Sequence, residues 1–214
     1  MINVALFGNP NVGKTTIFNL LTGSNQYVGN WPGVTIEKKE GYLNEDIKIV
    51  DLPGIYAMDT YSNEEKISKE FLENEKVDLI LNIIDASNID RNLYLTMQLK
   101  QFKKPIVLAV NMIDVAEKKG INIDYKKLGE LLNVIVVPIQ ASKEMGIDDI
   151  KTALSTIDYK KIDTLNYSFS DEKDSYSVSG IWKKGKLNGS VTTTASDGSY
   201  TSCHYSDDKP YGRL

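Results

Sequence analysis

The stretch GNPNVGKTT, residues 8–16, has the residue types and the spacing of a loop that binds phosphates. Its glycines let the backbone curl so that N–H groups face an anion, and the positive end of a following helix strengthens the attraction. In such a loop Lys14 contacts the β- and γ-phosphates of a nucleotide, while the hydroxyl of Thr15 binds Mg²⁺. The predicted phosphate site comprises Gly8, Asn9, Pro10, Asn11, Val12, Gly13, Lys14, Thr15 and Thr16.

A second motif, DLPG, occupies residues 51–54 directly after an apolar run. If that run is a strand, Asp51 lies at its carboxyl end, where open α/β sheets bind their ligands. We expect Asp51 to hold Mg²⁺ through water, and we place Gly54 in the same site. An aspartate that opens a turn is common, so this assignment depends on the phosphate loop beside it.

A third motif, NMID, occupies residues 111–114 and also follows an apolar run. The carboxylate of Asp114 can accept from both the ring N–H and the exocyclic amine of guanine, a pair of donors that adenine lacks. Asn111 and Met112 are expected to complete the base site. Met112 stands where lysine is usual, and its thioether and stem could cover the base by packing. The alternative for Asp114 is helix capping.

A fourth segment, QASKEMGID, begins at Gln140 and follows another apolar run. Its backbone N–H at Ala141 or Ser142 could donate to the guanine oxygen. The segment is weak evidence by itself, and its value lies in its order after the other three.

The segment YVGNWPGVTIE, residues 27–37, lies between the phosphate loop and the DLPG turn. This is where a mobile switch segment that contains a threonine is expected, ordered by the γ-phosphate and released on hydrolysis. Thr35 is therefore the candidate second ligand of Mg²⁺, with Gly33 and Val34 beside it. The alternative for Thr35 is an ordinary β-branched strand residue.

These motifs must be positioned by regular elements, and the hydrophobic pattern predicts a strand before each of the four. Strand-like runs occupy residues 3–7, 47–50, 79–84, 106–110 and 134–137. Helical patterns occupy residues 15–21, 63–74, 90–101, 125–132 and 147–156. Strands that alternate with helices predict an α/β fold with a mostly parallel sheet, six-stranded here, covered by helices on both faces.

Composition excludes several classes of protein. The formal net charge is −4, and without a Lys/Arg excess a non-specific nucleic-acid binder is not expected. A single cysteine, Cys203, and the absence of an N-terminal leader pattern favour the cytoplasm. Apolar stretches reach about ten residues, half of what a membrane helix needs, so no membrane span is predicted.

The composition changes after about residue 164. Residues 165–214 are rich in Ser, Thr, Gly and Tyr, with six acidic and six basic residues. Trp182 and Tyr205 are 23 positions apart, as are Gly189 and Gly212, which suggests two degenerate copies of a β-hairpin repeat. We therefore predict a nucleotide-binding domain at 1–160, a linker at 161–172 and two hairpin repeats at 173–214. The alternative for the tail is disorder.

Together, GNPNVGKTT, GNWPGVTIE, DLPGIYAMD, RNLYLTMQL and NMIDVAEKKGINID make residues 2–158 resemble the cytosolic GTPase domain of the bacterial ferrous iron transport protein B family. The resemblance implies a Ras-like P-loop G domain that binds GTP and Mg²⁺ and acts with a membrane domain that transports Fe²⁺. It places the chain in the cytoplasm, at the inner face of the cell membrane through that partner. The family's helical and membrane regions are not found here, so this chain alone is not expected to transport iron. The tail resembles membrane-occupation-and-recognition-nexus repeats.

The same resemblance implies activation by potassium, in which Asn11 and backbone carbonyls near Gly29 and Trp31 hold K⁺. Many such enzymes carry a water-orienting glutamine directly after the DLPG glycine, but this chain has Ile55. An aliphatic side chain cannot orient water, so K⁺ would supply the charge that an arginine finger supplies elsewhere. The alternative for Asn11 is a turn residue that satisfies its own backbone.

The leading hypothesis is therefore a slow, K⁺-stimulated GTPase whose catalytic residues are Asn11, Lys14 and Thr35. A non-hydrolysing GTP sensor that binds a protein is the alternative, favoured by Ile55 and by the missing transporter. A ribosome-associated GTPase is disfavoured because the tail is neutral.

Overall fold

The computed structural model describes residues 1–59 and 61–157, together with residues 166–170, 175–183, 186–195, 200–206 and 209–213. The chain divides into two units, one of residues 1–130 and 134–162 and the other of residues 131–133 and 163–214. Each unit contains its own sheet. No helix in the described ranges is both long and apolar enough to cross a membrane.

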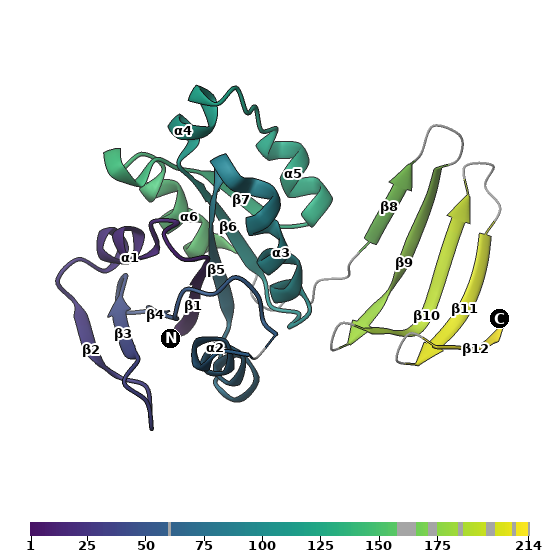
Figure 1. The fold of residues 1–214 in the computed structure, drawn as a ribbon, viewed down its shortest axis with the longest axis horizontal. Coiled ribbons are helices and arrows are strands. Elements are labelled where there is room, and N and C mark those ends of the chain that lie inside the picture. The colour runs from purple at the N-terminus through teal and green to yellow at the C-terminus, as the bar shows by residue number, and fades with distance from the viewer. Residues whose placement is uncertain are drawn as a thin grey trace. The chain divides into compact units, whose positions relative to one another are not determined.

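The first unit is built on a seven-stranded sheet with the order β2-β3-β4-β1-β5-β6-β7 (Figure 1). The five strands from β4 to β7 in this order are parallel, whereas β2 and β3 pair antiparallel at one edge of the sheet. The strands are β1 (Ile2–Gly8), β2 (Gln26–Asn30), β3 (Glu37–Tyr42), β4 (Ile47–Asp51), β5 (Leu79–Asp85), β6 (Ile106–Asn111) and β7 (Ile135–Pro138). The α/β fold with a mostly parallel sheet is confirmed, with one strand more than predicted.

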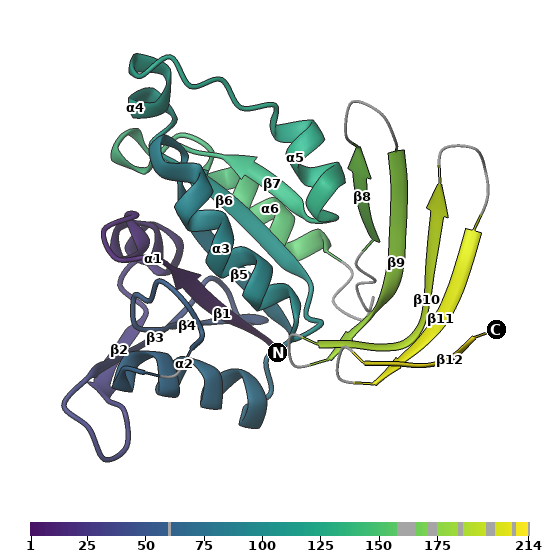
Figure 2. The ribbon, with the colours of Figure 1, turned by 45° about the vertical axis from the view of Figure 1, so that its right-hand side comes forward.

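Helices cover both faces of this sheet (Figures 1 and 2). One hydrophobic cluster lies under α1 and α6, and the other lies under α2 and α3. The helices are α1 (Lys14–Thr22), α2 (Asn63–Asn74), α3 (Ile89–Lys100), α4 (Ile113–Lys118), α5 (Tyr125–Leu132) and α6 (Ile147–Thr156), with short 3-10 turns η1 (Ala86–Asn88) and η2 (Ala141–Lys143). Because both faces are covered, the central strands are mostly apolar rather than alternating.

Strand β1 shows how one strand serves both faces. Val4 and Leu6 belong to the first cluster, while Ala5 and Phe7 belong to the second. All four are at most 1% exposed. The strand then ends at Gly8, and α1 begins at Lys14, so the phosphate loop lies at the carboxyl end of the sheet, as predicted.

In the first unit, the hydrophobic pattern of the sequence did not predict β2, β3 or α4. Strand β3 reads EKKEGY and has no apolar periodicity. It is held instead by backbone pairing on both sides and by surface ion pairs, in which Glu40 contacts both Lys38 and Lys48. Helix α4 has only six residues, too few for a periodic pattern to emerge.

The second unit is a five-stranded antiparallel sheet with the order β12-β11-β10-β9-β8. Its strands are β8 (Asn166–Ser170), β9 (Ser175–Lys183), β10 (Lys186–Ala195), β11 (Tyr200–Ser206) and β12 (Lys209–Arg213). The two predicted repeat copies span the β9–β10 and β11–β12 pairs. Strand β8 lies within the predicted linker at 161–172 and pairs with β9. The remaining linker residues lie outside the described ranges, and the repeat family stays a prediction.

Candidate nucleotide-binding site

The phosphate loop connects β1 to α1 and contains two residues in the left-handed backbone region, which few residues adopt. Asn11 and Gly13 both have left-handed backbones, with φ of 66° and 88°. A Cβ atom added to Gly13 would lie 2.5 Å from Nδ2 of Asn111, so a side chain there would collide with the neighbouring motif. Asn11, Thr15 and Thr16 are exposed, which leaves their side chains accessible to a ligand at the start of α1.

Asn111 joins three of the four predicted motifs. Asn111 is buried, with 4% of its residue surface exposed. Nδ2 donates to the backbone oxygen of Val12 at 2.9 Å, and Oδ1 accepts from the backbone N–H of Ala141 at 3.0 Å. Both sides of the amide are therefore used within the protein. Asn111 fixes the spacing between the phosphate loop and the base-binding loops.

This bridge changes the role of Ala141. We expected the N–H of either Ala141 or Ser142 to contact the guanine oxygen. The Ala141 N–H is committed to Asn111, so Ser142, which is exposed, is the remaining candidate. No sequence signal distinguished the two, because the choice depends on how the loop after β7 meets the end of β6.

Asp114 lies in the first turn of α4 and is half-buried. The helix begins after Met112, whose backbone is left-handed with φ of 62°, and no side chain caps it. Within the described residues, the Asp114 carboxylate has no hydrogen-bond or ion-pair partner. The capping alternative is therefore not supported, and both carboxylate oxygens are free to accept from a ligand.

Lys14 and Asp51 form an ion pair at the end of β4. Lys14 Nζ lies 2.5 Å from Oδ1 of Asp51 and also donates to the backbone oxygen of Leu52. The two side chains are only 12% and 9% exposed. Burial raises the pKa of the Asp51 carboxyl above its ordinary value, although the charge of Lys14 opposes the shift. The lysine predicted to bind phosphate and the aspartate predicted to bind metal are thus in direct contact.

The DLPG turn packs against the phosphate loop. A Cβ atom added to Gly54 would lie 3.3 Å from the backbone of Pro10, and the N–H of Ile55 donates to the oxygen of Gly8 at 3.3 Å. The Ile55 side chain is 2% exposed and belongs to the second hydrophobic cluster. It faces the core and not the phosphate site, which agrees with the expectation that it orients no water.

No hydrogen bond or ion pair among the described residues joins the switch segment, residues 27–37, to the phosphate loop. Gly29 lies in edge strand β2 and pairs with Lys38. The Trp31 N–H donates to Ile36, and its carbonyl accepts from Val34, so the carbonyl predicted to bind K⁺ is engaged in a turn. Thr35 is exposed on that turn, and no described contact joins it to the loop. The expected K⁺ ligands Gly29 and Trp31 therefore have backbone partners within this segment, in strand β2 and in the turn that follows it.

Trp31 itself anchors this segment in the core. Its ring is 5.5 Å from that of Phe71 in an edge-to-face arrangement, and Lys38 Nζ lies 4.8 Å from its centroid. The residue is 8% exposed. Gly33 and Val34 lie on the turn that follows Trp31. For these two residues to contact a nucleotide in the phosphate loop, as predicted, the segment would have to move.

Two residues of α3 were missed as functional candidates. The Arg91 guanidinium lies 4.2 Å from the ring centroid of Tyr56. Gln98 accepts from the N–H of Met58 at 2.7 Å and donates to Asp59 at 3.1 Å. Together they tie the segment after the DLPG turn to α3. The phrase RNLYLTMQL contains both residues, but nothing in its spacing indicated which segment they would contact.

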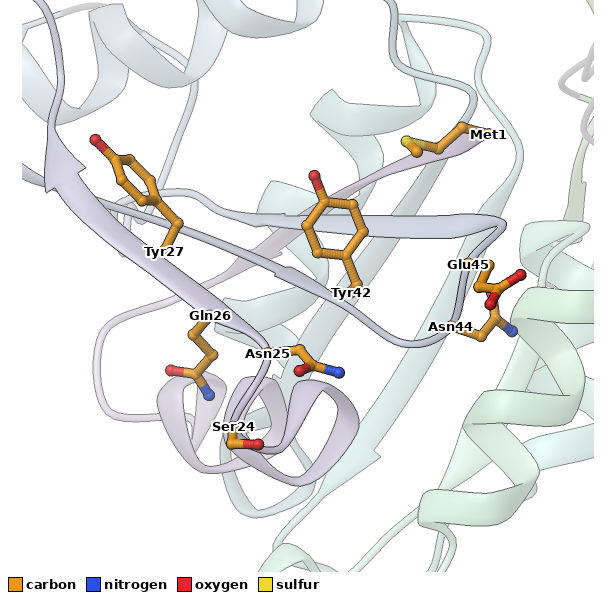
Figure 3. Close-up of a pocket in the computed structure, with 8 residues that line it drawn as sticks. All are labelled: Met1, Ser24, Asn25, Gln26, Tyr27, Tyr42, Asn44 and Glu45. Carbon is orange, nitrogen blue, oxygen red and sulfur yellow. The ribbon is translucent and has the colours of Figure 1, made fainter.

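An open hollow of about 740 Å³ lies at the amino end of β1, whereas the phosphate loop follows the carboxyl end. Figure 3 shows its lining, which includes the exposed rings of Tyr27 and Tyr42. The lining residues are Met1, Ser24, Asn25, Gln26, Tyr27, Tyr42, Asn44 and Glu45. None of them was predicted as a site residue.

Comparison with known proteins gives consistent matches over the first unit. Residues 2–154 match the family model described as ferrous iron transport protein B. The "Fe(2+) transporter FeoB" of Legionella pneumophila (strain Paris) is 49% identical over 161 residues, which is 72% of this chain and 21% of that protein. The chain therefore spans about a fifth of the length of this curated relative.

Solved structures show the same fold. A mutant of S. thermophilus NFeoB bound to mGDP is 45% identical, with a TM-score of 0.74 and coverage of 80% of this chain and 67% of that one. The cytosolic domain of L. pneumophila FeoB is 47% identical, with a TM-score of 0.72 and coverage of 78% and 74%.

Proposed function

The chain belongs to the ferrous iron transport protein B family, and we propose that it binds GTP and hydrolyses it slowly to GDP and phosphate with stimulation by K⁺. Its first unit is a P-loop G domain, the fold of nucleotide hydrolases. The proposed role is that of the nucleotide switch of a ferrous iron uptake system, which acts on a membrane domain or protein partner at the inner face of the membrane.

The free carboxylate of Asp114 carries the choice of guanine. Both sides of the Asn111 amide form hydrogen bonds within the protein, whereas neither oxygen of Asp114 does so among the described residues. A charged acceptor beside the base gains two hydrogen bonds from guanine and would stay unpaired beside adenine. Leaving such a group buried without partners costs about 1 to 3 kcal/mol, enough to favour GTP over ATP by about one to two powers of ten.

In this proposal Lys14 exchanges its ion pair with Asp51 for contacts with the nucleotide phosphates. Its ammonium group is already desolvated beside Asp51, so a triphosphate that enters the loop can take over part of this pairing at small further desolvation cost. Lys14 would then hold the β- and γ-phosphate oxygens. The exchange frees an oxygen of Asp51 and thereby links nucleotide binding to the end of β4.

The residues at the loop fit the two expected cations. The exposed Thr15 hydroxyl and the Asp51 carboxylate are oxygen donors of the kind that Mg²⁺ takes, with phosphate oxygens and water completing its shell. Asn11 presents an exposed neutral amide on a left-handed backbone, which suits a weakly hydrated monovalent ion. When bound, these cations would neutralise charge that develops on the phosphate oxygens.

The non-hydrolysing GTP sensor remains the second candidate because Ile55 is turned into the core. No polar side chain directly after the DLPG turn is then available to orient a water molecule. Hydrolysis must rely on Asn11, Lys14 and the switch segment, and a chain in which these never assemble would bind GTP without cleaving it.

One experiment separates these candidates. We expect the purified chain to bind a fluorescent GTP analogue and to release phosphate from GTP faster in KCl than in NaCl of equal ionic strength, with ATP as the control nucleotide. Tight GTP binding with no phosphate release in either salt would favour the sensor. Absence of GTP binding would contradict both.

A further inference from the structure

Asn9, the second residue of the phosphate loop, carries a buried amide that has no hydrogen-bond partner among the described residues. The residue is 3% exposed. Neither Oδ1 nor Nδ2 forms a hydrogen bond with any described residue. A buried amide that has given up its bonds to water and gained none is unfavourable, and native proteins rarely keep one without a functional reason.

The surroundings of Asn9 indicate what it could bind. The residue before it, Gly8, accepts from the N–H of Ile55, and the residue after it, Pro10, packs on Gly54. The DLPG turn therefore crosses the loop on both sides of Asn9. Asn9 also follows Phe7 by two positions, and Phe7 lies in the same hydrophobic cluster as Ile55.

Long backbone hydrogen bonds join this turn to β1 and the phosphate loop. The two backbone hydrogen bonds that join it to β1 and the loop, from Leu52 to Leu6 and from Ile55 to Gly8, measure 3.2 and 3.3 Å, at the long end of the normal range. Lys14 also donates to the Leu52 oxygen, so a lysine that turns to phosphates releases one further contact. A small shift of the turn would bring new backbone groups to Asn9.

We propose that Asn9 is a positioning residue for hydrolysis, whose amide pairs with the backbone of residues 53–55 once GTP draws the turn toward the γ-phosphate. The inference rests on the proposed GTPase function. The unpaired amide makes the present arrangement less favourable, and the pairing makes the GTP-bound arrangement more favourable. The same side chain therefore biases the turn toward the hydrolytic geometry.

The proposal predicts that removing the amide separates stability from turnover. Leu branches at Cγ as Asn does, is bulkier and has no polar atoms, so Asn9→Leu removes an unpaired group without opening a cavity. We expect the midpoint of thermal unfolding with GDP bound to be unchanged or higher, and the affinity for GDP to stay within about twofold. We expect kcat for GTP to fall about tenfold, the loss of one hydrogen bond made only on the way to the transition state.

Ser68 offers a matched control. It is fully buried in α2, and its Oγ likewise has no partner within the described residues, but it is distant in sequence from the nucleotide motifs. Ser68→Ala should not lower the unfolding midpoint and should leave kcat unchanged. Hydrogen exchange of a peptide that covers residues 52–58 localises the effect. Asn9→Leu should raise its exchange with a non-hydrolysable GTP analogue but not with GDP.

The outcomes are distinct. Unchanged kcat in a folded Asn9→Leu variant, or a loss of GDP affinity equal to the loss of kcat, overturns the positioning role. If Asn9→Leu does not fold, Asn9→Ala is measured in the same way, and failure of both to fold shows a purely structural residue. A parent chain that binds no GTP overturns the proposed function itself, and the Asn9 role with it.

Discussion

The ammonium group of Lys14 and the carboxylate of Asp51 form a largely buried ion pair, with 2.5 Å between Nζ and Oδ1. Lys14 begins α1 and Asp51 ends β4, so the pair connects the two motifs that are expected to hold phosphate and Mg²⁺. An anion that enters the loop would compete with Asp51 for Lys14. We therefore expect nucleotide binding to affect the DLPG turn through this one side chain.

This ion pair gives the first prediction, a pH dependence of stability. Burial raises the pKa of Asp51 above its ordinary value of 3.8, so the folded chain binds this proton more tightly than the unfolded chain. The contribution of Asp51 to the free energy of unfolding therefore falls as pH rises from 3.8 through the folded pKa, and is constant above it. Asp51→Asn cannot titrate, so the parent should lose stability relative to this variant across that window.

Urea titrations of both proteins between about pH 3 and pH 7 measure the difference, in which the other carboxylates cancel. If the parent instead gains stability over Asp51→Asn as pH rises, the folded pKa is depressed and the charge of Lys14 outweighs burial.

The second prediction separates binding from hydrolysis. Lys14→Ala should weaken GTP binding at least about a hundredfold, because it removes charge-assisted hydrogen bonds to the phosphates. Thr35→Ala should keep GDP affinity and lose turnover, because Thr35 is exposed on the β2–β3 turn and reaches the site only when the segment moves. Fluorescence titration and phosphate release measure the two effects. Equal losses of affinity and turnover in Thr35→Ala would make this threonine merely structural.

The third prediction concerns the bridge made by Asn111. Asn111→Ala removes two buried hydrogen bonds and leaves the Val12 oxygen and the Ala141 N–H unpaired. We expect a loss of about 2 kcal/mol in unfolding free energy, together with weaker GTP and GDP binding. The control is Asn74→Ala, because Asn74 is an exposed residue at the end of α2. A stable Asn111→Ala chain with full affinity would show that the two loops hold their spacing without the bridge.

The fourth prediction assigns base choice to Asp114. Asp114→Asn replaces one acceptor oxygen with a donor, so it should bind xanthosine triphosphate better than GTP. The loss for GTP should be about 10- to 100-fold, from the loss of charge-assisted hydrogen bonds. Competition with a fluorescent nucleotide measures both affinities. Undiminished GTP affinity in Asp114→Asn would place base recognition elsewhere.

The fifth prediction is that Asn11 mediates the potassium effect and that the second unit is not needed for it. Asn11→Ala should hydrolyse GTP at one rate in KCl and NaCl, whereas the parent should be faster in KCl, by up to about 10³-fold if K⁺ fully replaces an arginine finger. A truncation to residues 1–164 should retain the parent's rates. Potassium stimulation that persists in Asn11→Ala would rule out this ligand, and a folded but inactive truncation would make the tail part of the catalytic unit.

Much of this site could be predicted because its candidate residues lie in short contiguous stretches of the sequence. Each of the three motifs, residues 8–16, 51–54 and 111–114, begins at the last residue of a largely buried strand, and such strands are visible as mostly apolar runs. The order of these runs determined a parallel sheet whose carboxyl ends carry the motifs.

Tertiary structure alone decided which of these residues contact one another. That Asn111 bonds to Val12 and Ala141, 99 and 30 positions away, depends on the packing of β6 beside the phosphate loop. The polar strands β2 and β3 have no apolar pattern and form because β4 offers an edge to pair with. Local sequence specifies backbone preference and burial, whereas a hydrogen bond across the chain requires both partners to be placed by the fold. That placement determines that Lys14 pairs with Asp51. It also determines that the buried amide of Asn9 has no hydrogen-bond partner among the described residues.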